Sequence, residues 1–268
     1  MKYKLLAFDL DDTLLNEEFK ISAGNVQSLR RAAEAGLIIT IATGRMYRSA
    51  VPFARQLGIN IPLITYHGAL IKNAVSGEVI WHRPVPLEES MDIAQHAQEK
   101  GYHLNLFIDD RLHVAEENDF TRLYQKIARV DLQVVGNLRD FLEREQITPT
   151  KMNIAAPHTM PAVMADMREN FGHRVHVTLA RPDFLEITHG EATKGRALRH
   201  LTEEAGFERE EVAAIGDSLN DVDMLEYAGT GVAVANAREE VKQVAQVITR
   251  SNLEDGVAYF VDNYILNS

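Results

Sequence analysis

The first strand-like run of the chain ends in closely spaced carboxylates. Asp9 and Asp11 follow the apolar segment that starts at Lys4. In extended backbone, residues two apart face the same way, so both side chains are expected at the carboxyl end of one strand, where open α/β sheets bind ligands. Two carboxylates that close repel each other unless a cation lies between them or one is protonated, and Mg²⁺ prefers oxygen ligands. A pair of solvated loop aspartates is the alternative.

A second acidic pair follows another apolar run, where residues 216–221 read Gly-Asp-Ser-Leu-Asn-Asp. Asp217 and Asp221 are four residues apart and are expected one turn apart at the start of a helix. The helix dipole favours carboxylates at that end, so helix capping is the alternative for either residue. Capping does not explain why the pair matches the one after the first strand.

Two further segments carry groups that bind phosphate. The hydroxyl of Thr43 and the uncrowded N–H of Gly44 precede an expected helix, and Arg45 can add a planar charged fork. Lys194 opens another expected helix, where a cation opposes the dipole unless it meets an anion. Together with the acidic pairs, these groups are the set that phosphoryl transfer to a carboxylate requires.

Apolar strands that alternate with helices are predicted at both ends of the chain. The expected strands are 4–10, 37–42 and 62–66, and then 212–215 and 231–235. The expected helices are 22–36, 46–57, 193–206, one from residue 220, and a final helix to the C-terminus. This alternation predicts a parallel sheet covered on both faces.

Between residues 86 and 187 the pattern changes to strand pairs with short polar links, which indicates antiparallel pairing. Helices are expected at 87–100, 118–128, 138–145 and 161–171, and strands at 103–108, 112–115, 132–135, 152–156, 174–179 and 184–187. We therefore predict an α/β fold. It has a Rossmann-like, doubly wound parallel core of residues 1–82 and 189–268, with an α+β insert of residues 83–188.

The composition argues against several classes of partner. With 28 basic and 39 acidic residues, the net charge of −11 repels nucleic acid and anionic lipid, so we expect neither as a partner. The absence of cysteine excludes disulfides, thiolate metal sites and cysteine nucleophiles, and fits a cytoplasmic protein. No export signal or membrane span is visible. Oligomeric state is not indicated.

In order and context, these segments resemble the four motifs of the haloacid dehalogenase (HAD) superfamily. The resemblance is to its Cof-type phosphatases, whose type IIB cap corresponds to the predicted insert. The matching segments are residues 9–13, 43–45, Lys194 and 216–221, with further similarity at Asn236 and 251–256.

Two positions depart from the family pattern. Asp12 stands where the family usually has glycine, and residues 67–69 read His-Gly-Ala where Asn-Gly-Ala is usual. The role of His67 is left open between contact with the leaving group and simple packing.

The resemblance implies a Mg²⁺-dependent phosphatase of small phosphorylated metabolites, most simply sugar phosphates. Asp9 would attack phosphorus and form an aspartyl-phosphate, while Asp11 would protonate the leaving alkoxide and then activate water. Mg²⁺ would be held by the carboxylates of Asp9 and Asp217 and by the backbone carbonyl of Asp11. Asp221 would lie behind these ligands without touching the metal.

The resemblance also implies a set of phosphate ligands. They are Thr43, the amides of Leu10 and Gly44, Lys194 and Asn220, while Arg45 would contact the substrate. A sugar phosphomutase that uses the same phosphoenzyme and a catalytically silent ligand-binding regulator are the alternatives. True dehalogenation is disfavoured by Asp11. The residues of the insert that select the substrate are not identified.

Overall fold

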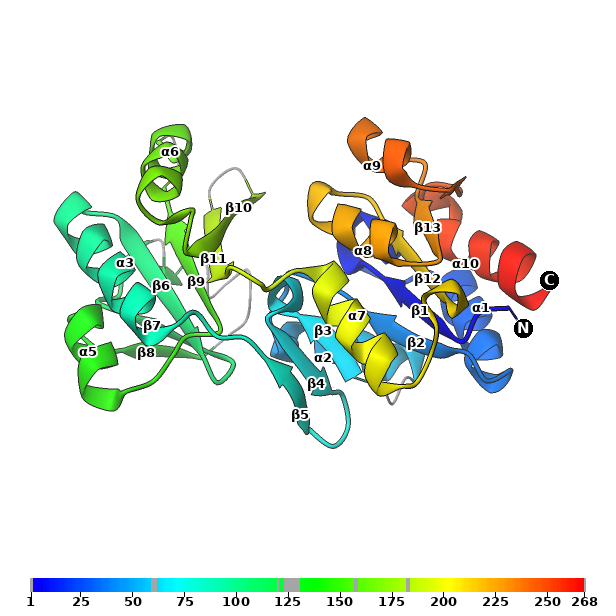
Figure 1. Ribbon diagram of the computed structural model, residues 1–268, viewed down its shortest axis with the longest axis horizontal. Coiled ribbons are helices and arrows are strands. Elements are labelled where there is room, and N and C mark those ends of the chain that lie inside the picture. The colour runs from blue at the N-terminus through cyan, green and yellow to red at the C-terminus, as the bar shows by residue number, and fades with distance from the viewer. Residues whose placement is uncertain are drawn as a thin grey trace. The chain divides into compact units, whose positions relative to one another are not determined.

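The computed structural model describes residues 2–58, 62–119, 121–122, 131–156, 159–181 and 184–267. The chain divides into two compact units (Figure 1). The core unit consists of Met1–Trp81 and Thr193–Ser268, and the insert unit of His82–Ala192. Most of the helix predicted at 118–128 lies outside the described residues. The functional roles of the two units stay predictions.

The core unit is built on a parallel five-stranded sheet, as predicted. The strand order is β14 (Val247–Ile248), β13 (Thr230–Ala233), β12 (Val212–Gly216), β1 (Leu5–Phe8) and β2 (Ile38–Ile41), and every neighbouring pair is parallel. The strands β1 and β12 are buried along their whole length, which explains their continuous apolar sequences. Because Phe8 pairs with Ile215 and Ile41, the residues that follow these strands emerge at one edge.

Helices cover this sheet. They are α1 (Ala23–Glu34), α2 (Tyr47–Leu57), α7 (Lys194–Glu204), α8 (Val222–Tyr227), α9 (Glu239–Val244) and α10 (Gly256–Phe260). Helix α7 packs against α8, and α1 packs against α10 (Figure 1). Ser22 caps α1 by accepting a hydrogen bond from the N–H of Asn25, so the helix begins where a hydroxyl satisfies a free amide.

Two details of the core unit differ from the prediction. Strand β3 (Pro62–Thr65) pairs antiparallel with β4 (Leu70–Asn73) in a three-stranded sheet completed by β5 (Val79–His82), and its link to β2 is one parallel bridge, Ala42 to Ile64. The prediction of a single final helix after residue 235 was wrong, because that segment holds α9, β14, α10 and short helical turns. The strands β4, β5 and β14 are short, and the sequence pattern did not indicate them.

The insert unit is an α+β sandwich. Its six strands run in the order β10 (Val175–Arg181), β11 (Phe184–His189), β9 (Lys151–Ala155), β6 (His103–Ile108), β7 (Arg111–Val114) and β8 (Leu132–Val134). Helices α3 (Leu87–Lys100), α5 (Leu138–Glu145) and α6 (Met160–Phe171) pack on one face. The hairpins β6–β7 and β10–β11 are antiparallel, as the short polar links predicted, whereas β7 and β8 are parallel.

Side chains alternate across the insert sheet. Leu104 and Leu106 face the helices and join the apolar core, and Phe107 belongs to the opposite face. On that opposite face, Lys151 of β9 and Glu186 of β11 form an ion pair, and both side chains are buried. The Lys151 ammonium also lies 5.0 Å from the ring centroid of Phe107.

None of the helices in the described part of the chain is long and apolar enough to cross a membrane.

The buried ion pair gives a test of the insert sheet. Lys151→Met should lower the free energy of unfolding by about 3–5 kcal/mol, because it removes the Lys151 ammonium from the buried Glu186 carboxylate. The double variant Lys151→Met/Glu186→Leu should recover much of that loss. Urea denaturation followed by circular dichroism measures both. An unchanged stability in the single variant would contradict the assignment.

Candidate active site

The carboxyl end of β1 places Asp9 in the interior of the core unit. Asp9 is 6% exposed, and its N–H donates to the carbonyl of Ile215 at 3.0 Å. The chain then turns through Leu10–Leu14, where Asp12 has a φ of 57°. The amide of Asn236 donates to the carbonyl of Asp12 at 2.7 Å and holds this turn.

Lys194 is fully buried between two carboxylates. Its ammonium donates to Oδ1 of Asp9 at 2.7 Å and to Oδ1 of Asp221 at 2.6 Å. Burial alone would lower the pKa of Lys194, but the two carboxylates raise it above its ordinary value. A lysine at the first position of α7 thus meets anions, as the sequence indicated.

The loop after β12 carries the other two members of the acidic cluster. Oδ2 of Asp221 accepts hydrogen bonds from the N–H groups of Asp217 (3.1 Å) and Ser218 (3.0 Å). Gly216 is needed beside them, since a Cβ there would lie 2.5 Å from Cβ of Asp221. Oδ1 of Asp217 accepts from the Thr13 hydroxyl at 2.8 Å. Asp221 therefore uses both oxygens to organise the site.

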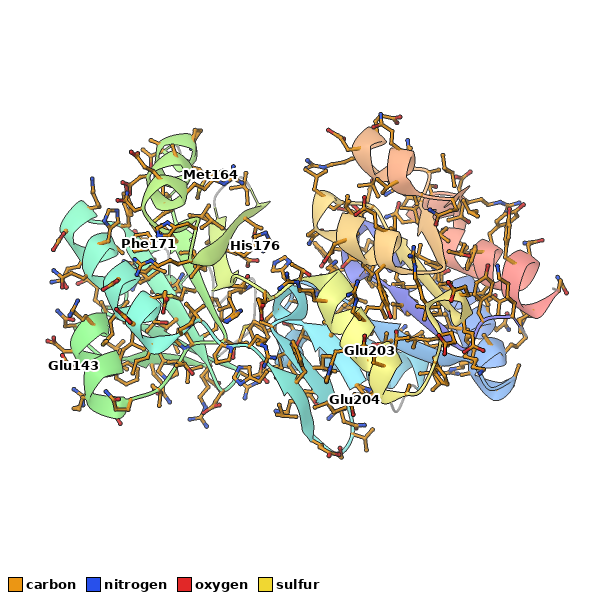
Figure 2. All side chains as sticks on the ribbon, viewed as in Figure 1. Glu143, Met164, Phe171, His176, Glu203 and Glu204 are labelled. Carbon is orange, nitrogen blue, oxygen red and sulfur yellow. The ribbon has the colours of Figure 1, made fainter. Side chains whose placement is uncertain are left out.

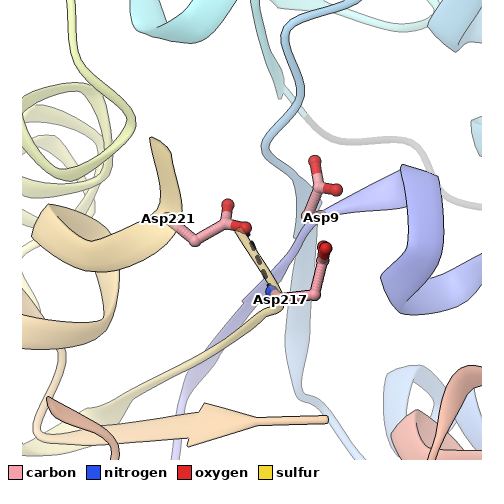
Figure 3. Close-up of side chains that lie close together, drawn as sticks. All are labelled: Asp9, Asp217 and Asp221. Atoms are coloured by element: carbon pink, nitrogen blue, oxygen red, sulfur yellow. Dashed lines mark hydrogen bonds between the residues drawn. The ribbon is translucent and has the colours of Figure 1, made fainter. Parts of the chain in front are cut away.

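Three carboxylates converge at this edge of the sheet (Figure 3). Oxygens of Asp9, Asp217 and Asp221 lie within 4.8 Å of one another. Burial raises the pKa of Asp9 well above its ordinary value, Lys194 opposes this, and the neighbouring aspartates add to the rise. Burial and then Asp221 raise the pKa of Asp217 to about 7. The single positive charge of Lys194 does not neutralise the three carboxylates.

A divalent cation fits this donor set. Asp9 and Asp217 each have a second carboxylate oxygen to which the described residues donate no hydrogen bond, whereas both oxygens of Asp221 are used. Hard oxygen donors that repel one another are the ligands that Mg²⁺ takes. The residues present therefore fit a divalent cation such as Mg²⁺.

Asp11 does not join the carboxylate cluster. Its carboxylate makes a two-point ion pair with Arg45, whose Nε donates to Oδ2 at 2.7 Å and whose Nη2 donates to Oδ1. The guanidinium also lies near the rings of Phe19 and Phe53. The two-residue alternation of β1 ends at Phe8, where the backbone turns, and the roles expected for Asp11 stay predictions.

The loop after β2 brings Thr43 and Gly44 to the same edge. Thr43 is buried, and its hydroxyl accepts from the N–H of Arg45 at 3.2 Å. Gly44 packs against an imidazole, since a Cβ there would lie 2.2 Å from Cε1 of His67. Nδ1 of His67 is 3.2 Å from Nδ2 of Asn220.

The structure thus brings most of the predicted residues together. Asp9, Asp217, Asp221 and Lys194 form one cluster, and Gly44 and Asn220 meet through His67, which the sequence left without a role. The one available signal for His67 was its departure from the family pattern. The proposed ligand roles of these residues, and of the Leu10 amide, stay predictions.

Comparison with known proteins identifies the family. The model of the haloacid dehalogenase-like hydrolases matches residues 6–261. The chain belongs to this family.

Relatives match nearly the whole HAD-like chain. It is 31% identical to the 5-amino-6-(5-phospho-D-ribitylamino)uracil phosphatase YitU of Bacillus subtilis, with 97% of each chain covered. It is 27% identical to the pyridoxal phosphate phosphatase YbhA of Escherichia coli, over 99% of this chain and all of that one. A HAD-like hydrolase from Bacteroides thetaiotaomicron has a similar crystal structure, with a TM-score of 0.87, 29% identity, and coverage of 98% of this chain and 99% of that one.

The acidic cluster of this HAD-like hydrolase predicts an unusual pH dependence of stability. A raised pKa means that the folded state holds a proton that the unfolded state has lost. Between about pH 4 and pH 7, Asp217 therefore makes the metal-free protein less stable as pH rises. Asp217→Asn should stabilise the chelator-treated protein at pH 8, by on the order of 2 kcal/mol, and have little effect at pH 4.

Thermal unfolding at the two pH values measures this effect. Glu204→Gln is the matched control, because Glu204 is exposed at the C-terminal end of α7, the opposite end from Lys194 (Figure 2). Equal changes in unfolding temperature at pH 4 and pH 8 would show that the surroundings of Asp217 do not raise its pKa.

Proposed function

We propose that this chain is a Mg²⁺-dependent phosphatase that hydrolyses small phosphate monoesters, most simply sugar phosphates, through an aspartyl-phosphate on Asp9. The observation that carries the proposal is the buried Lys194, bonded to both Asp9 and Asp221 at the strand edge. Family membership and relatives named as phosphatases support the reaction class. Two of those names specify small phosphorylated metabolites, which supports a substrate of that size.

Asp9 is the proposed nucleophile. Lys194 bonds Oδ1 and orients the carboxylate, so that Oδ2 would attack phosphorus. Oδ1 has a second lone pair, which would then bind the cation. The new bond joins Oδ2 to phosphorus, and the ester P–O bond breaks. The leaving alkoxide takes a proton from Asp11. Water then attacks phosphorus and gives a proton to Asp11. The bond between Oδ2 of Asp9 and phosphorus breaks, which releases inorganic phosphate.

Mg²⁺ would be held by the carboxylates of Asp9 and Asp217 and by the carbonyl of Asp11. When bound, it supplies the positive charge that lets a dianionic phosphate approach the carboxylates. Asp221 holds Lys194 and the loop amides in place.

The phosphoryl oxygens would be bound by donors from four segments of the core unit. Thr43 and the amides of Leu10 and Gly44 supply neutral donors, while Lys194 supplies charge and Asn220 supplies an amide. Such donors stabilise the charge on the transferring group best when they are fixed beforehand. The close packing of Gly44 on His67 and the burial of Lys194 provide that fixation.

Arg45 would link substrate binding to Asp11. Its guanidinium holds the Asp11 carboxylate in a two-point ion pair. A substrate phosphate that competes for Arg45 would release Asp11 for its role as the acid. The insert unit would act as a cap that selects the leaving group and excludes water.

Replacement of the nucleophile tests the core of the proposal. Asp9→Asn should lower kcat by more than about a thousandfold, because the amide keeps the shape but does not attack phosphorus. Exhaustive chelation should abolish wild-type turnover, and added Mg²⁺ should restore it. Release of inorganic phosphate from a sugar phosphate, with no bisphosphate activator, is the measurement, and it separates a phosphatase from a phosphomutase.

Asp12→Asn is the control for this experiment. Asp12 is exposed, and asparagine tolerates its positive φ, so this variant should keep its activity. Substantial turnover by Asp9→Asn would move the attack to another residue.

The acid role of Asp11 has a separate test. An alkoxide needs a proton as it leaves, and general acid catalysis contributes about 10²–10⁴-fold, whereas a phenolate leaves without that help. Asp11→Asn should therefore slow phosphoenzyme formation strongly with an alkyl ester and much less with an aryl ester. Rapid mixing with an aryl phosphate should show a burst of phenol and then a slow phase, since water activation is also lost. An equal loss for both leaving groups would make Asp11 a structural residue.

A further inference from the structure

The imidazole of His67 is fixed inside the candidate site by its backbone. His67 is 7% exposed, and both Tyr66 and His67 have positive φ, at 52° and 57°. The N–H of Tyr66 donates to the carbonyl of Arg45 at 3.0 Å, and that of His67 donates to the carbonyl of Thr43 at 3.1 Å. Two successive non-glycine residues in this region are uncommon and persist only where the surroundings hold them. The turn is therefore locked onto the segment that carries Gly44.

The turn around His67 contacts three of the four segments that carry the proposed phosphate ligands. Its ring lies on Gly44, as the 2.2 Å approach of a Cβ at that position shows. A Cβ on Gly68 would lie 2.1 Å from the carbonyl oxygen of Thr193, the residue that caps α7. Nδ1 of His67 is 3.2 Å from Nδ2 of Asn220. This turn thus joins the loops after β2 and β12 through His67 and abuts the start of α7 through Gly68.

The amide of Asn220 is satisfied at one end only. Nδ2 donates to Nδ1 of His67, while Oδ1 is buried and has no hydrogen-bond partner among the described residues. A buried acceptor without a donor is costly. A half-turn of the amide exchanges its ends, so that Oδ1 accepts from Nδ1–H of the other imidazole tautomer. Nδ2 then occupies the unsatisfied position, where its N–H groups need an acceptor.

We propose that His67 is a positioning residue for phosphate. When a phosphate is bound, Nδ1–H of His67 donates to Oδ1 of Asn220, and this directs the Nδ2 N–H groups of Asn220 to a phosphoryl oxygen. The neutral imidazole exchanges its proton with water, losing it at Nε2 and gaining it at Nδ1, so no net charge changes. This inference rests on the proposed function, because it orders one of the phosphate ligands named there.

The tautomer of His67 gives a direct readout in the unaltered protein. Nitrogen NMR of histidine-labelled protein with Mg²⁺ should show the proton on Nε2 without phosphate and on Nδ1 at saturating inorganic phosphate. His67→Asn identifies the His67 signals. An Nδ1 that stays unprotonated in the phosphate-saturated protein would overturn the proposal. A wild-type protein that bound no phosphate would overturn both this inference and the proposed function.

Two replacements of His67 separate positioning from packing. His67→Leu fills space without a donor, whereas His67→Asn places an amide near the position of Nδ1. His67→Leu should weaken phosphate binding about 10- to 100-fold, the range for a hydrogen bond to a charged group, and lower kcat/KM for an aryl phosphate similarly. His67→Asn should restore most of the loss.

A double-mutant cycle shows whether His67 acts through Asn220. In an Asn220→Ala background, His67→Leu should change phosphate affinity by less than about twofold, because the amide to be oriented is gone. Calorimetric titration with inorganic phosphate measures all four proteins and needs no turnover. Equal losses in both backgrounds would refute the role of Asn220, even where wild-type phosphatase activity is normal.

Discussion

The ion pairs of a single buried lysine determine much of the core unit. Lys194 has no exposed surface, and its desolvated ammonium requires negative partners, which Asp9 and Asp221 provide. These partners follow different strands, so the requirement ties the ends of β1 and β12 to the start of α7. The sheet register, which sets Phe8 opposite Ile215, makes this meeting possible.

Close backbone packing holds the rest of the site around this charge. Gly216 makes room for Asp221, Gly44 makes room for His67, and Gly68 lies against the carbonyl of Thr193. Each contact is too short for a Cβ, so a larger residue would push apart two loops that carry functional groups. A chain of amides adds to this, because Asn252 donates to Oδ1 of Asn236, whose own amide holds the turn after Asp9.

The sequence predicted the sheet, the edge at which the candidate site residues gather, and most of the residues found there. It succeeded where one local rule decided the outcome. Continuous apolar runs gave the buried parallel strands, and a lysine at a helix start indicated an anion. Strand alternation was extended past Phe8, where β1 ends, to Asp11, whose carboxylate the structure pairs with Arg45. The turn that follows β1 is held by Asn236, which donates to the carbonyl of Asp12 from 224 residues further along the chain.

His67 shows the same limit in another form. Its place is set by two positive φ values and by contacts with Gly44 and Asn220, which belong to loops far apart in the chain. No local pattern encodes such a meeting. The glycine of the Thr-Gly-Arg segment was explained by an uncrowded amide, whereas the structure adds the imidazole that lies against it.

The acidic cluster explains how a protein with a net charge of −11 can bind an anion. The diffuse field of surface carboxylates is screened within about 8 Å at physiological salt, so local charges decide what enters the site. Without a cation, Asp9 and Asp217 resist ionisation, as their raised pKa values show. Binding of a cation would reduce the repulsion between these carboxylates and so stabilise the folded protein. The same cation would supply the positive charge that a phosphate requires. The repulsion between the carboxylates and their affinity for a cation therefore have the same electrostatic origin.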